Sequence, residues 1–244
     1  MQLVTSIFEN RINRRTIIHG AITLTGTLAA VQLGSAKKAQ AQSTSLSQRK
    51  GILLAVDLQN GFLITPECEA VVPKVVDNAS KFYQVWATRF FNRNPNFSRQ
   101  LNWNEMVSGQ ETELSKTLIP VVSKTFDKPS YSPISTTLLK VNIVSRFLFF
   151  HAHAPTSFVM SPALLQALQN NAITTVAVCG VDTDACVMAT ALGLFDAGFE
   201  TFVVSDGCAS SGGQEYHEAA IKILKRNIGE KYVIPFSELP AMLF

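Results

Sequence analysis

The sequence predicts an α/β protein with three layers, α/β/α, built on a mainly parallel, Rossmann-like sheet of about six strands. Continuous apolar runs alternate with amphipathic helical patterns, as in sheets that helices cover on both faces. The 244 residues suffice for one such domain, and 47% hydrophobic residues with 16% charged residues exclude a disordered chain. The predicted strands are residues 51–57, 85–91, 121–126, 173–178, 201–205 and 232–235.

Four helical patterns lie between these runs, at residues 71–83, about 161–170, 186–197 and 214–226. Strand and helix in regular succession predict parallel strands whose carboxyl ends meet at one edge of the sheet, where ligands gather. The segment 131–170 is longer than a single crossover helix requires, so we expect an insertion at about 141–160. It could be a lid, an oligomer contact or a segment outside the fold, and the sequence leaves these alternatives open.

The first 41 residues resemble an export signal. Arg14 and Arg15 precede an uncharged stretch that runs to Ser35, and the AQA sequence at 39–41 has the form of a cleavage site. This order is typical of a twin-arginine signal and predicts export to a bacterial periplasm, with a mature start near Gln42. A single amphipathic or membrane-anchoring N-terminal helix is the alternative, and without a signal the protein would be cytoplasmic. We therefore divide the chain into a signal (1–41), a polar leader (42–50) and a folded domain (51–244).

The charge distribution excludes a nucleic-acid partner. The formal net charge is +3, but residues 1–41 hold five basic side chains and one acidic one, which leaves 16 basic and 17 acidic side chains. Phosphate binding needs a clustered basic excess instead. Arg146, His151 and His153 interrupt the apolar stretch 141–158, so we expect no stable membrane span in the mature protein.

Four cysteines occur without a CxxC spacing or a histidine cluster that would indicate zinc: Cys68, Cys179, Cys186 and Cys208. Their even number allows two disulfides in an oxidising compartment. However, Cys179 lies inside an apolar run and is expected to pack as a buried thiol. Cys68 and Cys208 are expected in loops, and the sequence assigns neither of them a role.

The strongest local pattern surrounds Cys186. A buried strand reaches Gly180, a short polar turn follows, and a helix of small residues begins near Cys186, which is the order of a nucleophile elbow. A helix N-terminus favours the thiolate, so the pattern predicts a pKa of the Cys186 thiol below its ordinary value. A small buried cysteine in a packed helix is the alternative.

Two further residues stand at the ends of predicted strands. Asp57 ends the first strand and could accept the thiol proton, although it could also be a helix cap or a loop acid. Lys128 follows the third strand and could meet both residues, although taken alone it would be interpreted as a surface lysine.

Together, the VDLQNGF sequence at 56–62, Lys128 ahead of the YS pair at 131–132 and the CGVDTDACV sequence at 179–187 resemble the isochorismatase-like cysteine hydrolases. That superfamily includes nicotinamidases and N-carbamoylsarcosine amidohydrolase. The resemblance covers residues 51 to about 236 apart from the insertion. It implies the isochorismatase-like hydrolase fold, a triad of Asp57, Lys128 and Cys186, a cis peptide between Val181 and Asp182, and an oxyanion hole formed by the amides of Asp182 and Cys186.

Nicotinamidases place an Asp and two His after the second strand to hold a metal, whereas this chain reads ATRFFNRN at 87–94. We therefore expect no metal, no cofactor and no nicotinamidase activity. Arg89 and Asn92 are expected to bind a carboxylate or carbonyl group of the substrate, with a structural ion pair as the alternative for Arg89. Asn60, Phe62 and Tyr131 complete the predicted substrate-binding set.

The predicted function is an exported hydrolase that cleaves a C–N bond of a small amide through a thioester on Cys186. Asp57 would move the proton and Lys128 would balance the charge. One alternative is a vinyl-ether hydrolase that uses no cysteine, and another is a non-catalytic binding protein. The expected partners are a small-molecule substrate and further copies of the chain in a homo-oligomer. His217 is expected to be a surface or cap residue.

Overall fold

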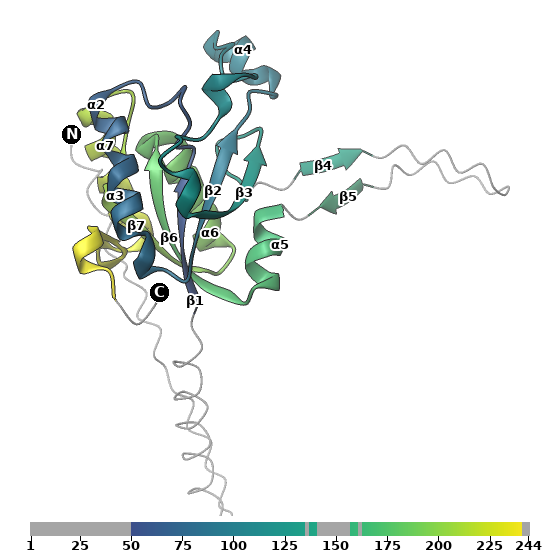
Figure 1. The fold of residues 1–244 in the computed structure, drawn as a ribbon. Helices are drawn as coiled ribbons and strands as arrows, with labels where there is room; N and C mark the ends of the chain where they lie inside the picture. The colour runs from purple at the N-terminus through teal and green to yellow at the C-terminus, as the bar shows by residue number, and fades with distance from the viewer. Residues whose placement is uncertain (1–49, 135–136, 141–156, 161–162, 241–244) are drawn as a thin grey trace, which may run out of the picture. The chain divides into compact units, whose positions relative to one another are not determined.

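A computed structural model of the protein describes residues 50–134, 137–140, 157–160 and 163–240 (Figure 1). The chain divides into residues 1–45 and 46–244. The predicted signal, the leader up to residue 49 and most of the predicted insertion lie outside the described residues. The main sheet contains β1 (Lys50–Val56), β2 (Gln84–Phe90), β3 (Val122–Lys128), β6 (Ile173–Val181), β7 (Glu200–Ala209) and β8 (Val233–Ile234).

This sheet has six strands in the order β3-β2-β1-β6-β7-β8, and every neighbouring pair is parallel. The predicted fold class is therefore confirmed. The chain builds outward from β1 toward β3 and then from β6 toward β8, so the direction of strand addition reverses between β1 and β6. In open parallel sheets, the carboxyl ends at such a reversal form the ligand crevice.

Helices cover the sheet on both faces. The connection from β1 to β2 and those from β6 to β8 run in opposite directions along the sheet. Because such connections are right-handed, α3 lies on one face and α6 and α7 lie on the other. The helices α6 and α7 contact each other and β7. The α-helices are α2 (Pro66–Glu69), α3 (Val71–Asn78), α4 (Pro95–Leu101), α5 (Ala163–Asn170), α6 (Met188–Asp196) and α7 (Gln214–Ile228). Short turns add η1 (Ala79–Lys81), η2 (Gln110–Thr112), η3 (Ile119–Val121), η4 (Thr183–Val187), η5 (Glu230–Tyr232) and η6 (Phe236–Glu238).

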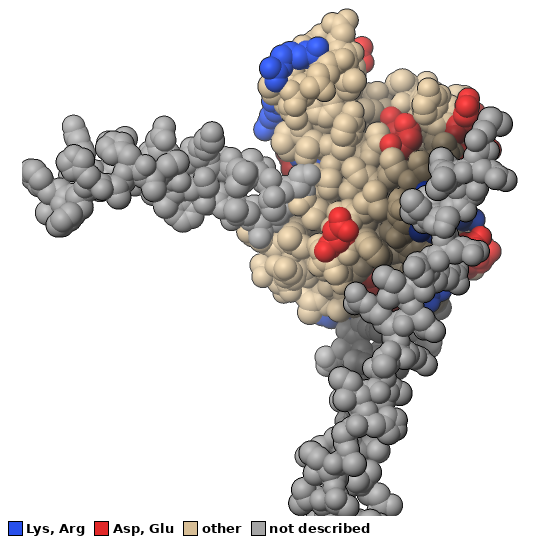
Figure 2. Space-filling model, turned by 180° about the vertical axis from the view of Figure 1, so that it is seen from behind, with Lys and Arg blue, Asp and Glu red and all other residues tan. Residues whose placement is uncertain are grey.

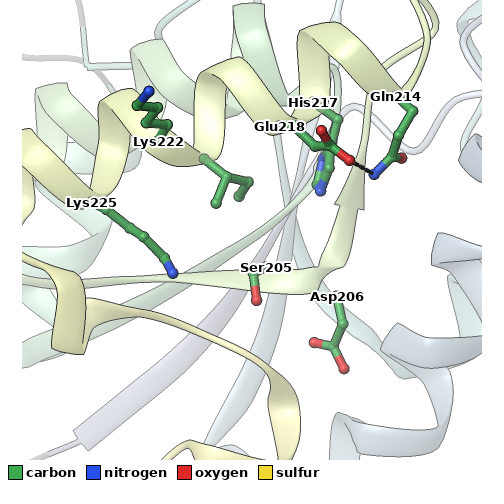
Figure 3. Close-up of a pocket in the computed structure, with 8 residues that line it drawn as sticks. Ser205, Asp206, Gln214, His217, Glu218, Lys222 and Lys225 are labelled. Carbon is green, nitrogen blue, oxygen red and sulfur yellow. Dashed lines mark hydrogen bonds between the residues drawn. The ribbon is translucent and has the colours of Figure 1, made fainter.

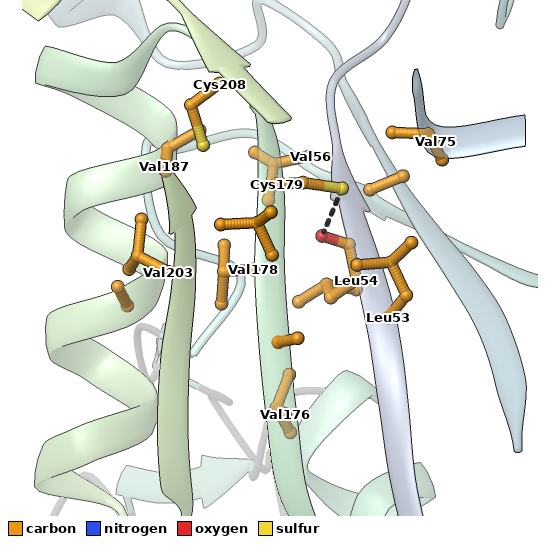
Figure 4. Packing of buried hydrophobic residues seen from close by; sticks show 14 of the residues in the cluster. Leu53, Leu54, Val56, Val75, Val176, Val178, Cys179, Val187, Val203 and Cys208 are labelled. Carbon is orange, nitrogen blue, oxygen red and sulfur yellow. Dashed lines mark hydrogen bonds between the residues drawn. The ribbon is translucent and has the colours of Figure 1, made fainter. Parts of the chain in front are cut away.

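The core lies around the central strands β1 and β6, whose apolar residues are buried on both faces (Figure 4). Every residue of β1 after Lys50 is buried, as expected for a strand between two helical layers. Cys179 lies in this core with its thiol 3.7 Å from the carbonyl oxygen of Leu54, so it packs as a small buried residue. The core therefore fixes the ends of β1 and β6, from which the site is built.

Gly180 lets β1 and β6 approach each other at that end. Its φ is +122°, and a Cβ there would collide with the backbone of Val56 on β1.

We expect Gly180→Ala to lower the free energy of unfolding by about 3–5 kcal/mol, from backbone strain and overpacking together. Urea denaturation measures this loss. Gly198 is the matched control, because its φ is +88° but it has nothing within 4 Å. Gly198→Ala should cost only about 1–2 kcal/mol, and equal losses would contradict the steric argument.

Several elements differ from the sequence prediction. The helix α4 was not predicted, although Asn94 caps it and Pro95 opens it. Cys68 lies in α2 and Cys208 in β7, and both are buried, so the expectation that they lie in loops is wrong. The strand β7 continues to Ala209 because its second half still pairs with β6. All four cysteines are free thiols.

The region of the predicted insertion is described only at its ends. There β4 (Thr137–Lys140) and β5 (Ser157–Met160) pair in antiparallel fashion, separately from the main sheet. Residues 141–156 lie outside the described residues, so the role of this region stays open. Within the described ranges, no helix has the length and hydropathy that a membrane span needs.

Figure 2 shows one face of the molecule, on which the charged groups of the described residues are scattered among uncharged atoms. Large apolar side chains are exposed at several positions of the described chain, among them Ile64, Leu101 and Phe195. The expected homo-oligomer remains a prediction.

Candidate active site

Three side chains meet beyond the carboxyl ends of β1, β3 and β6. Asp57 follows β1, Lys128 ends β3, and Cys186 lies in η4, the π-helical turn after β6. The Nζ of Lys128 lies 2.6 Å from Oδ2 of Asp57 and 3.3 Å from Sγ of Cys186. All three residues are buried, with exposed fractions of 0%, 3% and 6% for Asp57, Lys128 and Cys186. The structure thus brings together the residues that the sequence predicted as a triad.

Asp57 is held by the neighbouring strand β2. Its backbone has a positive φ of 51°, and its amide donates to Oγ1 of Thr88 at 3.2 Å. The Thr88 hydroxyl in turn donates to Oδ1 of Asp57 at 2.7 Å. No aligned hydrogen bond from the described residues reaches the other oxygen, Oδ2, although it is close to the Lys128 ammonium. One carboxylate oxygen is therefore fixed by Thr88, while the other can still accept a proton.

Lys128 connects the carboxylate and the thiol. Besides these two groups, its ammonium donates to the carbonyl oxygens of Ser130 at 2.9 Å and Tyr131 at 3.0 Å. It also lies 5.2 Å from the centre of the Phe90 ring. Burial alone lowers the pKa of Lys128, but the nearby Asp57 carboxylate and, less strongly, the neighbouring Cys186 outweigh it and raise the pKa. Lys128 is therefore a cation at neutral pH.

The turn that carries Cys186 is shaped by the carbonyl of Asp182. This oxygen accepts from the amides of Ala185 at 3.1 Å and Val187 at 3.0 Å. The sequence predicted a helix that begins near Cys186, but the regular helix α6 begins only at Met188, after this wider turn. On the helix side, the Thr190 hydroxyl donates to the carbonyl oxygen of Cys186 at 2.6 Å.

The prediction of a lowered thiol pKa is wrong. Burial raises the pKa of Cys186 well above its ordinary value, and the nearby carboxylate of Asp57 raises it further. Lys128 lowers the pKa, but not enough to offset the other two causes. The thiol of the resting protein is therefore protonated at neutral pH.

The peptide bond between Val181 and Asp182 is cis, as the resemblance implied. The carboxylate of Asp182 accepts from the amide of Ser211 at 2.7 Å and from its hydroxyl at 2.8 Å. The assignment of the Asp182 and Cys186 amides to an oxyanion hole stays a prediction.

Comparisons with known proteins find similarities over the part of the chain that carries Cys186. The family model for the Isochorismatase domain matches residues 148–232, which include the Cys186 turn. The isochorismatase domain-containing protein 2 of Xenopus laevis is 40% identical over 60 residues, which are 24% of this chain and 29% of that protein. The chain thus spans less than a third of that curated relative in the match.

Two solved structures share the fold. A nicotinamidase pyrazinamidease from Acinetobacter baumanii has a TM-score of 0.58 and 21% identity, over 79% of this chain and 99% of that one. An N-carbamoylsarcosine amidase from Thermoplasma acidophilum has a TM-score of 0.55 and 20% identity, over 76% and 95%. The chain therefore resembles the Isochorismatase domain in sequence over residues 148–232 and shares the fold of these two solved structures.

Aromatic side chains flank Asp57, Lys128 and Cys186. Trp103 stacks on Phe90 with ring centres 5.5 Å apart, and Phe62 contacts both rings at 6.0 and 6.1 Å. Tyr131 packs on Phe97 at 5.1 Å. Burial raises the pKa of Tyr131, and the neighbouring Cys186 raises it further, so Tyr131 lies close to this thiol. Phe62 and Tyr131, both predicted for substrate binding, thus belong to one aromatic group next to Lys128.

The other three predicted substrate-binding residues make structural contacts instead. Arg89 points to the face of β2 opposite Thr88 and Phe90, because side chains alternate along a strand. There it pairs with Asp127 through two bonds of 2.9 and 3.2 Å. The Asn92 amide donates to the carbonyl oxygens of Trp103 and Glu105, and the exposed Asn60 amide donates to that of Gln110. The ion pair of Arg89 favours the structural alternative for this residue, and the assignment of Arg89 and Asn92 to substrate binding stays a prediction.

Three residues near Asp57, Lys128 and Cys186 have contacts that the sequence did not predict: Thr88, Trp103 and His217. Thr88 orients Asp57, but a threonine inside a buried strand carries no signal of this role. Trp103 lies in a segment for which no structure was predicted. His217 was expected at the surface, yet its Nδ1 lies 2.8 Å from Oγ1 of Thr183 in the Cys186 turn.

No group of three or more metal-ligating side chains occurs among residues 50–134, 137–140, 157–160 and 163–240. The segment that follows β2 presents Phe91, Asn92 and Arg93 beyond the end of the strand. Phe91 lies between two guanidinium groups, 5.2 Å from that of Arg89 and 5.0 Å from that of Arg93. These neighbours suit ring packing rather than the binding of a cation.

Proposed function

We propose that the chain is a hydrolase that cleaves the C–N bond of a small amide through a thioester on Cys186. The observation that carries the proposal is the buried contact of Lys128 with both Asp57 and Cys186, at 2.6 and 3.3 Å. A carboxylate with an oxygen still open to a proton, beside a protonated thiol, is what a proton transfer requires.

In the first half-reaction, Oδ2 of Asp57 takes the proton from Sγ of Cys186 as the sulfur attacks the carbonyl carbon of the amide. The carbonyl π electrons move to oxygen, and backbone amides at Asp182 and Cys186 would stabilise that oxyanion. The tetrahedral intermediate then collapses. The C–N bond breaks, Asp57 returns the proton to the leaving nitrogen, and the acyl group remains on sulfur.

In the second half-reaction, Asp57 takes a proton from a water molecule that attacks the thioester carbon. The C–S bond breaks, the sulfur recovers the proton from Asp57, and the carboxylic acid is released. Lys128 stays protonated throughout and lowers the cost of negative charge on either partner. Because the resting thiol is neutral, the thiolate forms only when an electrophilic carbon is present to receive it.

The aromatic side chains around Lys128 favour a substrate with a flat, apolar acyl group. Phe62 and Trp103 are only partly buried and Tyr131 is exposed, so their rings can contact a bound molecule. Arg89 already forms an ion pair with Asp127, so its guanidinium group is not free to bind a substrate carboxylate. We therefore propose neutral aryl or alkyl carboxamides as the first compounds to test.

A panel of such amides tests the proposal by the release of ammonia or amine. Acid quenching during turnover should trap an enzyme whose mass is increased by the acyl group, with the modification on the peptide that contains Cys186. Cys186→Ala should release nothing and trap nothing. Cys68→Ala is the matched control, because Cys68 is equally buried but lies in α2 outside the triad.

The same variants separate the two alternatives. A vinyl-ether hydrolase would keep its turnover in Cys186→Ala, because that reaction uses no thiol. A binding protein would release no product from any compound, even one that raises its melting temperature. Either result would contradict the amidase proposal.

Export through the N-terminal signal remains a proposal, supported by Arg14, Arg15 and the AQA sequence at 39–41. Expression of the full chain in a bacterial host should give a periplasmic product whose N-terminus lies near Gln42. Terminal sequencing reads the cleavage point directly. The double variant Arg14→Lys with Arg15→Lys is the control. Its chain should stay uncut in the cytoplasm. An uncut wild-type chain in the cytoplasm would contradict the proposal.

A further inference from the structure

Three consecutive residues ahead of Cys186 are fixed by side-chain hydrogen bonds to one segment, residues 210–217. The carboxylate of Asp182 accepts two hydrogen bonds from Ser211. Asp184 accepts from the Ser210 hydroxyl at 2.5 Å. Thr183 bonds to His217 at 2.8 Å. The start of the turn is therefore set by the segment that joins β7 to α7.

The contact between Thr183 and His217 differs from the other two. Thr183 is fully buried with an exposed fraction of 0%, so its hydroxyl depends on a protein partner. Burial, with a smaller contribution from Lys74, lowers the pKa of His217, so the ring is neutral at neutral pH and can share one hydrogen with the hydroxyl. His217 also lines a cavity of about 510 Å³ beside α7, with Ser205, Asp206 and Lys222 among the other lining residues (Figure 3).

We propose that His217, acting through Thr183, is a positioning residue for the Cys186 nucleophile. This inference rests on the proposed function and adds to it a residue outside the triad. Within the described residues, His217 forms no hydrogen bond or ion pair with Cys186, Asp57 or Lys128, and its side chain contacts Thr183. It acts by holding the Thr183 side of the turn, while Thr190 holds the carbonyl of Cys186 on the side of α6.

The position of the Cys186 thiol depends on the hydrogen bond between Thr183 and His217. The Nζ of Lys128 lies 3.3 Å from Sγ of Cys186. The backbone that carries this thiol is a π-helical turn and not a regular α-helix. Misplacement of a reacting group by about 1 Å can cost about 100-fold in rate. Loss of the contact between Thr183 and His217 frees the first residue of the turn. The thiol of Cys186 should then be less well oriented toward Asp57 and more exposed to solvent.

The experiment compares Thr183→Val, His217→Ala and their double variant, with kcat measured well below each melting temperature. Valine keeps the shape of threonine without its hydroxyl, so both single variants lose the same contact. We expect each to lower kcat about 10–100-fold with KM changed less than about 3-fold, and the double variant to lose no more than either single variant. His217→Asn places an amide atom near the position of Nδ1 and should restore most of the loss. Lys222→Gln, on the same helix and cavity, is the matched control and should behave as wild type.

A second measurement is independent of the proposed reaction. The rate at which iodoacetamide alkylates Cys186 at pH 9 should rise at least about 5-fold in Thr183→Val and His217→Ala, because a loosened turn exposes the buried thiol. Unchanged alkylation in both variants, or kcat within about 2-fold of wild type when Cys186→Ala is inactive, would overturn the inference alone. Turnover that survives Cys186→Ala would overturn the proposed function, and the alkylation rates would still decide the role of His217.

Discussion

Asp57→Asn is expected to lower kcat for amide hydrolysis by about 10²–10⁴-fold, the range for loss of a general base. Asparagine keeps an oxygen that can accept from the Thr88 hydroxyl, now bonded to Oδ1 at 2.7 Å. It cannot take the proton of Cys186 or return it to the leaving nitrogen. The substitution therefore removes the chemistry at Oδ2 while it preserves the shape of the site. Steady-state kinetics on the amide found by the screen measures the loss.

The stability of this variant has to be measured beside its activity. Removal of one partner of a buried ion pair costs about 3–5 kcal/mol when the other charge is left unpaired. Lys128 keeps the carbonyl oxygens of Ser130 and Tyr131 as acceptors, so we expect only part of that cost. Thermal melts and kinetics at a temperature where the variant is folded separate the two effects.

Asp127→Asn is the matched control for Asp57→Asn. It also removes a carboxylate from an ion pair at the end of β3, but that pair with Arg89 is largely exposed, and such pairs contribute about 0–1 kcal/mol. Its kcat should equal that of the wild type. Addition of Cys186→Ala to Asp57→Asn should cost little more than either change alone, because the two residues move the same proton. An Asp57→Asn enzyme with wild-type kcat would mean that this carboxylate is structural.

The sequence was sufficient to predict the sheet and the convergence of the triad. Buried parallel strands are continuous apolar runs, and their carboxyl ends lie at one edge, so residues that end such runs must come together. Pattern and topology brought the three residues to one edge of the sheet, although 129 positions separate Asp57 from Cys186 in the numbering. Their assignment as a triad, and that of Lys128 above all, depended on the resemblance to the isochorismatase-like cysteine hydrolases.

The sequence could not predict what depends on packing across the fold. The direction of Arg89 depends on which face of β2 looks toward the site, and Thr88 and Phe90 occupy that face. The role of His217 depends on where α7 begins relative to the Cys186 turn. The thiol pKa depends on burial by distant segments, so the helix-dipole argument gave the wrong sign for Cys186.

The reaction of Cys186 with iodoacetamide should accordingly be slow at pH 7 and should rise about tenfold for each pH unit up to at least pH 9. Only the thiolate reacts, and its fraction grows tenfold per unit as long as the pH is below the pKa. Burial and the Asp57 carboxylate both hold that pKa above its ordinary value. Rates from pH 6 to pH 10, followed by mass spectrometry of the Cys186 peptide, measure this dependence. The thiol of Cys208, whose pKa burial raises to about 12, provides an internal reference that should remain unmodified throughout.

The two charged neighbours should shift this profile in opposite directions. Asp57→Asn removes a cause that raises the pKa of Cys186, so alkylation at pH 8 should become faster although hydrolysis is lost. Lys128→Met removes the cation that lowers the same pKa, so alkylation should become slower. A variant that reacts faster with an alkylating agent and yet hydrolyses nothing would separate thiolate formation from catalysis. Asp57 would then be needed to carry the proton to the leaving nitrogen, and not to activate the sulfur in the resting enzyme. A wild-type profile that levels off below pH 8 would contradict this mechanism, because it would mean that the thiolate is already formed before substrate binds.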